Sequence, residues 1–113
     1  MSQVLFRTDV SSILSQWKAG LLTALQVHDW ATDRFATDAW DPEDGAVNEV
    51  LARLDMMDMN LVTEEDVPVL LAALGETTAA AAADIVDAYQ DTIDLAARQR
   101  KLVDVPQYSR FCS

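Results

Sequence analysis

The chain has 113 residues, half of them hydrophobic and only three each Gly and Pro, which predicts one globular domain over 1–113 and excludes a disordered chain. Its single cysteine, Cys112, excludes a disulfide framework and a cysteine-built zinc site, and we expect a reducing, cytoplasmic location without secretion or membrane insertion. The net charge of −11 disfavours nucleic acid and membrane surfaces as partners and favours a basic protein.

The first predicted helix lies within residues 8–20. Its apolar residues recur at i, i+3, i+4 and i+7, which is the spacing of one helix face: Val10, Ile13, Leu14 and Trp17. Gly20 is placed to end this helix in the left-handed conformation. We expect the helix to turn its Trp17 side into the core.

A second helix is predicted to start at Thr23. Thr23 and Gln26 have the spacing of a capping box, in which each side chain bonds the backbone of the other residue. The inner face of this helix is predicted to hold Val27, Trp30, Ala31 and Phe35. His28, the only histidine, is expected at the edge of the core or paired with Asp29 or Asp33.

The third helix is predicted to begin in the stretch DPED. Asp41 is the expected N-cap and Pro42 the first helical residue, a position where the missing N–H of proline costs nothing. The core-facing stripe follows as Val47, Val50, Leu51 and Leu54.

A fourth helix is predicted after the stretch TEED, with Thr63 or Asp66 as its cap. Pro68 must lie in the first turn, because deeper in a helix it would cost about 3 kcal/mol. The inner face before Gly75 is predicted to hold Val67, Leu70, Leu71 and Leu74.

The last predicted helix is the longest and covers residues 78–103. Four aspartates recur along one side of it and are interpreted as a solvated face: Asp84, Asp87, Asp91 and Asp94. After it, residues 104–113 show no periodicity and are predicted to form an extended or mobile tail. The sequence therefore predicts an all-α, single-domain bundle of four to five helices with a long C-terminal helix and no sheet.

Negative charge is concentrated in the middle of the chain. Residues 38–94 hold fifteen acids and one base, Arg53, so this segment has a net charge of −14. Some of these acids start helices, and the surplus is interpreted either as a binding face for a basic partner or as a solubility feature. Trp40, among acids, is either an exposed anchor or a lid over the end of the bundle. The predicted partner-binding residues are Asp38, Trp40, Asp41, Glu43, Asp44, Asp55, Asp58, Glu64, Glu65 and Asp66.

Motifs of catalysis and cofactor binding give negative results. The chain lacks a glycine-rich phosphate loop, and the stretch after Trp40 fails as a calcium loop because Leu51 would occupy its last ligand position. His28 and Cys112 are each the only residue of their kind, so a Cys–His pair is disfavoured. We therefore expect no enzyme activity, no cofactor and no metal.

The chain resembles, in size, charge and helix content, the bacterial immunity proteins that neutralise nuclease toxins, the colicin immunity family among them. That family carries a D-x-Y-Y-P motif. Here the stretch DAYQD supplies Asp87 and Tyr89 and lacks the second Tyr and the Pro. The resemblance implies a small helical protein whose acids and aromatic residues cover a basic toxin surface.

The sequence thus favours a non-catalytic protein-binding inhibitor, an immunity protein for a basic nuclease toxin. Three alternatives stay open: an acidic adaptor or chaperone, a small enzyme or metal binder that uses carboxylates, and a DNA mimic. The identity of the partner, and whether the chain is a monomer or a homodimer, are also left open.

Overall fold

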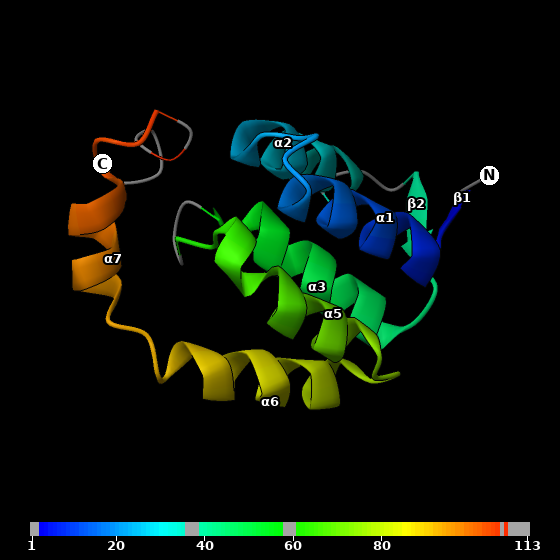
Figure 1. Cartoon of the computed structure of the whole chain (residues 1–113). Helices are drawn as coiled ribbons and strands as arrows, with labels where there is room; N and C mark the ends of the chain where they lie inside the picture. The colour runs from blue at the N-terminus through cyan, green and yellow to red at the C-terminus, as the bar shows by residue number, and fades with distance from the viewer. Residues whose placement is uncertain (1–2, 36–38, 58–60, 107, 109–113) are drawn as a thin grey trace.

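The computed structural model describes residues 3–35, 39–57, 61–106 and 108. Within these residues it contains six α-helices, one 3₁₀ helix and two short strands (Figure 1). They are β1 (Gln3–Leu5), α1 (Arg7–Lys18), α2 (Ala24–Phe35), β2 (Trp40–Pro42), α3 (Gly45–Asp55), η1 (Glu64–Asp66), α5 (Val67–Leu74), α6 (Ala79–Gln90) and α7 (Leu95–Leu102). The fold is mostly helical, as predicted, but the described residues hold more helices than the predicted four to five.

The core lies around α3, which contacts α2, α5 and α6. Figure 1 shows α1 and α2 on one side of α3 and α5, with α6 on the other. The buried face of α3 includes the predicted stripe of Val47, Val50, Leu51 and Leu54. A Cβ on Gly45 would lie 2.7 Å from the backbone N of Ala79, so the first turn of α3 packs directly on the start of α6.

In α1 and α2, the buried face of α1 and the cap of α2 follow the sequence pattern. Val10, Leu14 and Trp17 are buried on α1, and Gly20 follows with a φ of +82°. The Thr23 N–H donates to the Gln26 Oε1 at 2.9 Å, and the Gln26 N–H donates to the Thr23 Oγ1 at 3.2 Å. The predicted capping box is therefore confirmed.

A two-stranded parallel sheet is present, so the prediction of no sheet is wrong. β1 pairs with β2, and Val4 lies opposite Asp41. Asp41 and Pro42 are strand residues, and the predicted N-cap role belongs instead to Asp44, whose Oδ1 accepts the Val47 N–H at 3.0 Å. Three-residue strands are too short to show a period-2 pattern, and their pairing joins segments far apart in the chain.

The prediction of one long C-terminal helix is wrong, because the helix is interrupted between α6 and α7. The Thr92 hydroxyl donates to the Tyr89 carbonyl at 2.6 Å, and the Asp94 Oδ1 accepts the Ala97 N–H at 3.0 Å. Threonine and aspartate side chains compete in this way with helical backbone bonds, so they end one helix and begin the next. Residues 91–94, between the two helices, direct α7 away from α6 (Figure 1).

Part of the segment 104–113 is attached to the body. Tyr108 is only 4% exposed, and its hydroxyl accepts the Glu64 N–H at 3.1 Å. Residues 107 and 109–113, which complete the predicted tail and include Cys112, lie outside the described residues. Among the helices that the structure describes, none is both long enough and apolar enough to cross a membrane.

Candidate functional site

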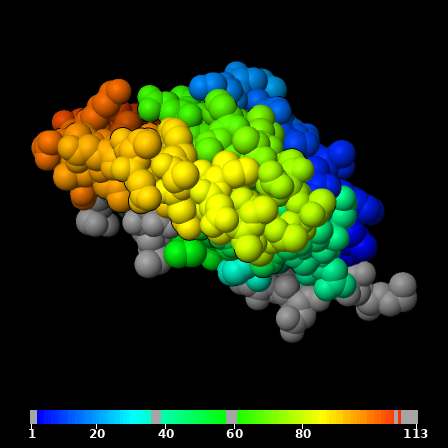
Figure 2. Space-filling view, turned by 90° about the horizontal axis from the view of Figure 1, so that it is seen from below, coloured from blue at the N-terminus to red at the C-terminus, as the bar shows by residue number. Residues whose placement is uncertain are grey.

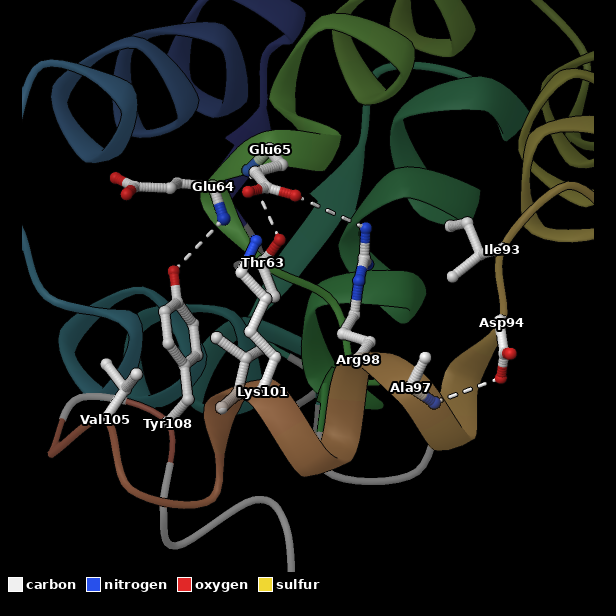
Figure 3. A pocket seen from close by; sticks show the side chains of 11 residues that line it. Thr63, Glu64, Glu65, Ile93, Asp94, Ala97, Arg98, Lys101, Val105 and Tyr108 are labelled. Carbon is white, nitrogen blue, oxygen red and sulfur yellow. Dashed lines mark hydrogen bonds and ion pairs between the residues drawn. The ribbon is translucent and has the colours of Figure 1, made fainter.

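A groove with a volume of about 370 Å³ lies between η1 and α7 (Figure 3). η1 forms one wall, and α7 with the residues that flank it forms the other. Its lining residues are Thr63, Glu64, Glu65, Ile93, Asp94, Ala97, Arg98, Lys101, Leu102, Val105 and Tyr108. We call this hollow the η1–α7 groove.

The η1 wall is built by a second capping box. The Thr63 Oγ1 accepts the Glu65 N–H at 3.3 Å, while the Asp66 Oδ2 accepts the Thr63 N–H at 3.0 Å. This confirms Thr63 as a cap. Fixing both ends of the turn leaves the Glu65 side chain 65% exposed at the rim of the groove.

The wall that α7 and its flanking residues provide is partly apolar. Leu102 and Val105 are half-buried against the core, and Ile93 and Ala97 line the groove beside them. No residue of α7 itself is buried. This helix therefore offers apolar surface to the groove without belonging to the core.

A buried carboxylate lies beside the groove. Asp66 is 5% exposed, and it accepts hydrogen bonds from the Arg98 Nη1 and from the Tyr89 hydroxyl, both at 2.8 Å. Burial opposes the charge of Arg98, but Asp66 outweighs burial and raises the pKa of the guanidinium above its ordinary value. Burial raises the pKa of Tyr89, and its bond to the Asp66 carboxylate raises it further.

Two of the predicted acids, Glu43 and Asp44, pair with Arg7 at the start of α3. The guanidinium binds Glu43 at 2.9 Å, binds Asp44, and donates to the carbonyl oxygens of Leu74 and Glu76. Burial would raise the pKa of Asp44, but the Val47 N–H and Arg7 outweigh it and lower that pKa. These acids therefore fasten β2 and α3 to the end of α5.

Trp40 takes the position of a lid. The Arg34 Cζ lies 4.4 Å from the centroid of the Trp30 ring and 4.9 Å from that of Trp40. Both indoles are half-buried and pack against the core. A smaller hollow of about 240 Å³ lies beside them. This arrangement supports the lid alternative for Trp40 rather than the free anchor.

The remaining predicted residues are placed separately. Asp55, at the end of α3, accepts the Thr32 hydroxyl at 2.7 Å, and its carbonyl oxygen lies 3.0 Å from the His28 Nε2. Asp41 is exposed on β2. Asp38 and Asp58 lie outside the described residues.

The predicted acids that the structure describes lie at separate places on the molecule. Glu43 and Asp44 precede α3, while Asp55 closes it, and an eleven-residue helix spans about 16 Å. Glu64, Glu65 and Asp66 come together at η1. Only the η1 acids border a groove, so the candidate site contracts to this end of the molecule.

The α7 side of the groove was missed by the sequence reasoning. In a continuous helix over 78–103, Ile93 and Leu102 would extend away from η1 and would form no groove with it. The signal for the turn is Thr92–Asp94, where Asp94 stands before an apolar segment as an N-cap does. Tyr108 was missed as well, because its partner, the Glu64 N–H, is remote in sequence.

Neither a metal site nor a similar protein gives further information on this groove. Among the described residues no group of three or more His, Cys, Asp and Glu is placed to hold a metal ion. The chain matches no protein-family model, no curated protein and no solved structure.

Proposed function

We propose that the chain is a non-catalytic protein-binding inhibitor, of the immunity type, that receives a basic and partly apolar segment of its partner in the η1–α7 groove. The observation that carries the proposal is the pairing of an apolar groove lining with exposed carboxylates at the rim. Interfaces concentrate their energy in such apolar centres with polar rims.

Charge around the groove favours a basic segment. Glu64, Glu65 and Asp94 line it, and of its two bases only Lys101 extends into solvent, because Arg98 is paired with the buried Asp66. The net charge of −11 acts in the same direction at longer range. A field of this sign speeds the approach of a basic protein more than it strengthens the final complex.

The other predicted acids support the proposal less. Arg7 pairs with both Glu43 and Asp44, so its charge offsets one of these two negative charges. The two residues of the immunity-like fragment also have internal partners: Asp87 binds Arg53 at 2.9 Å, and Tyr89 binds Asp66. The proposed contact surface is thus centred on Glu64 and Glu65.

The test is capture of a partner with the tagged chain, followed by association rates at two ionic strengths. The double variant Glu64→Gln/Glu65→Gln is expected to associate about tenfold more slowly at low salt, with a weaker salt dependence. The matched control, Asp33→Asn/Asp84→Asn, removes the same charge from exposed positions on α2 and α6. Equal slowing by both pairs would show that only total charge matters and would remove the groove from the proposal.

Inhibition is separated from simple binding by the activity of the captured partner. An inhibitor is expected to abolish that activity at equimolar concentration, with nuclease activity assayed first. An adaptor or chaperone, the alternative class, would leave the partner active in the complex. That result would contradict the inhibitor proposal while keeping the groove as a binding site.

A further inference from the structure

α7 differs from the other helices in how it is attached. It is eight residues long, and none of its residues is buried, whereas α3 and α5 each bury at least four. Figure 2 shows α7 at one end of the molecule, beyond the end of α6. An isolated helix of this length is not stable in water, so the contacts that hold α7 also keep it folded.

Among the described residues, Arg98 provides the polar contacts of this attachment. Arg98 donates to Asp66 at 2.8 Å and to the carbonyl oxygen of Leu61 at 3.4 Å, and it lies 3.8 Å from Glu65. Leu102 adds apolar contact with the core. After the helix, Tyr108 is fastened to the Glu64 N–H. Every one of these polar contacts reaches η1 or the residues just before it.

The other end of α7 has the features of a hinge. Residues 91–94 separate α6 from α7, and the Thr92 and Ile93 N–H groups bond only to the last turn of α6. Asp94 caps α7 with its side chain. A rotation at this segment would move α7 without breaking a contact within α6 or α3.

We propose that α7 is a strap that sets the width of the η1–α7 groove, with residues 91–94 as its hinge and the Arg98–Asp66 ion pair as its latch. Opening moves the two walls apart, exposes more of Ile93 and Leu102, and uncovers the Asp66 carboxylate. The latch therefore limits access to this surface until a basic partner competes with Arg98 for the same carboxylate. This regulatory role rests on the proposed function, but the opening itself does not.

Hydrogen exchange of the free chain tests the opening directly. The amides of α7 are expected to exchange at least tenfold faster than those of α3, because they open without global unfolding. Arg98→Gln is expected to speed exchange in α7 and at residues 63–66 about tenfold further, with Arg98→Lys in between. Arg100→Gln, an exposed base on the same helix, is the matched control and is expected to change nothing.

Exposure of the groove is measured with Nile red, a neutral apolar dye that the negative charge of the chain does not repel. Arg98→Gln is expected to raise its fluorescence several-fold, and adding Leu102→Ser is expected to reverse the rise. The strap is refuted if α7 exchanges in the wild type as slowly as α3, a result that needs no variant to fold. It is equally refuted if Arg98→Gln speeds exchange in α3 as much as in α7. Both measurements use the chain alone, so a failure of partner binding at Glu64 and Glu65 remains distinguishable.

Discussion

Arg7 pairs, within the folded chain, with two of the acids that give the sequence its excess of negative charge. Its guanidinium joins Glu43 and Asp44 to two carbonyl oxygens at the end of α5, and it is 30% exposed. Solvent screens these contacts in part, because the Arg7 side chain is not fully buried. Arg7 is therefore a structural residue that pairs with two acids predicted from the sequence to bind a partner.

Replacing Arg7 by Gln is expected to lower the free energy of unfolding, because it leaves Asp44 half-buried without its cation. Urea denaturation gives this value. Arg100→Gln, on the exposed face of α7, is the matched control and should stay within about 0.5 kcal/mol. Equal losses in the two variants would mean that Arg7 contributes only net charge.

Asp44 also predicts how stability depends on pH. Its pKa is lowered in the folded chain, so its contribution to stability is complete above its ordinary pKa of 3.8 and is lost as the pH falls through the lower folded value. Between pH 5 and pH 2, Asp44→Asn should therefore lose less stability than the wild type. Urea midpoints over this range measure the difference. Asp84→Asn, on the exposed face of α6, is expected to keep the wild-type slope, and an identical slope in all three proteins would contradict the role of Asp44.

Residue-level prediction succeeded where the chemistry is local. The caps at Thr23 and Thr63 bond groups two or three residues away, so the sequence contains all the information that they need. The prediction of Asp41 as the N-cap was wrong, because the stretch DPED contains two aspartates, Asp41 and Asp44, that could cap the helix. The choice of Asp44 depends on β1 and Arg7, which are remote in sequence.

At the level of elements, the stripe on α3 was predictable because a helix buried among three others shows its period clearly. The same method overstated α5, where Leu71 is half-buried although the spacing placed it in the core. It also joined α6 and α7 into one helix, since alanine and aspartate spacing continues across residues 91–94. The groove could not be predicted, because it exists only once that helix is broken.

The two leucines give an expected difference in stability. Leu51 is 1% exposed on α3, and its replacement by Ala should lower the free energy of unfolding by about 2–5 kcal/mol through the cavity it leaves. Leu71→Ala removes the same atoms from a half-buried position and should cost less than half as much. Urea denaturation of both variants measures the ratio. A larger loss at Leu71 would show that α5 packs more tightly than α3.

Across the whole molecule, three arginines hold the layers together through acids that were expected to face a partner or solvent. Arg7 joins β2 and α3 to α5, Arg53 joins α3 to α6 through Asp87, and Arg98 joins α7 to η1 through Asp66. All three pairs have atoms within about 3 Å of each other. The remaining acids are dispersed over a body that measures 42 × 26 × 23 Å.

These two sets of charges respond differently to salt, which gives a last prediction. The Debye length is about 30 Å at 0.01 M and about 8 Å at 0.15 M, so moderate salt screens repulsion across the molecule and leaves contacts of 3 Å nearly intact. The free energy of unfolding should therefore rise over this range, although isolated surface ion pairs would make it fall. Asp84→Asn/Asp91→Asn lowers the net charge from −11 to −9 and should both stabilise the chain at 0.01 M and flatten the rise. Urea denaturation at several salt concentrations decides, and a fall in stability would mean that the arginine pairs are solvated rather than packed.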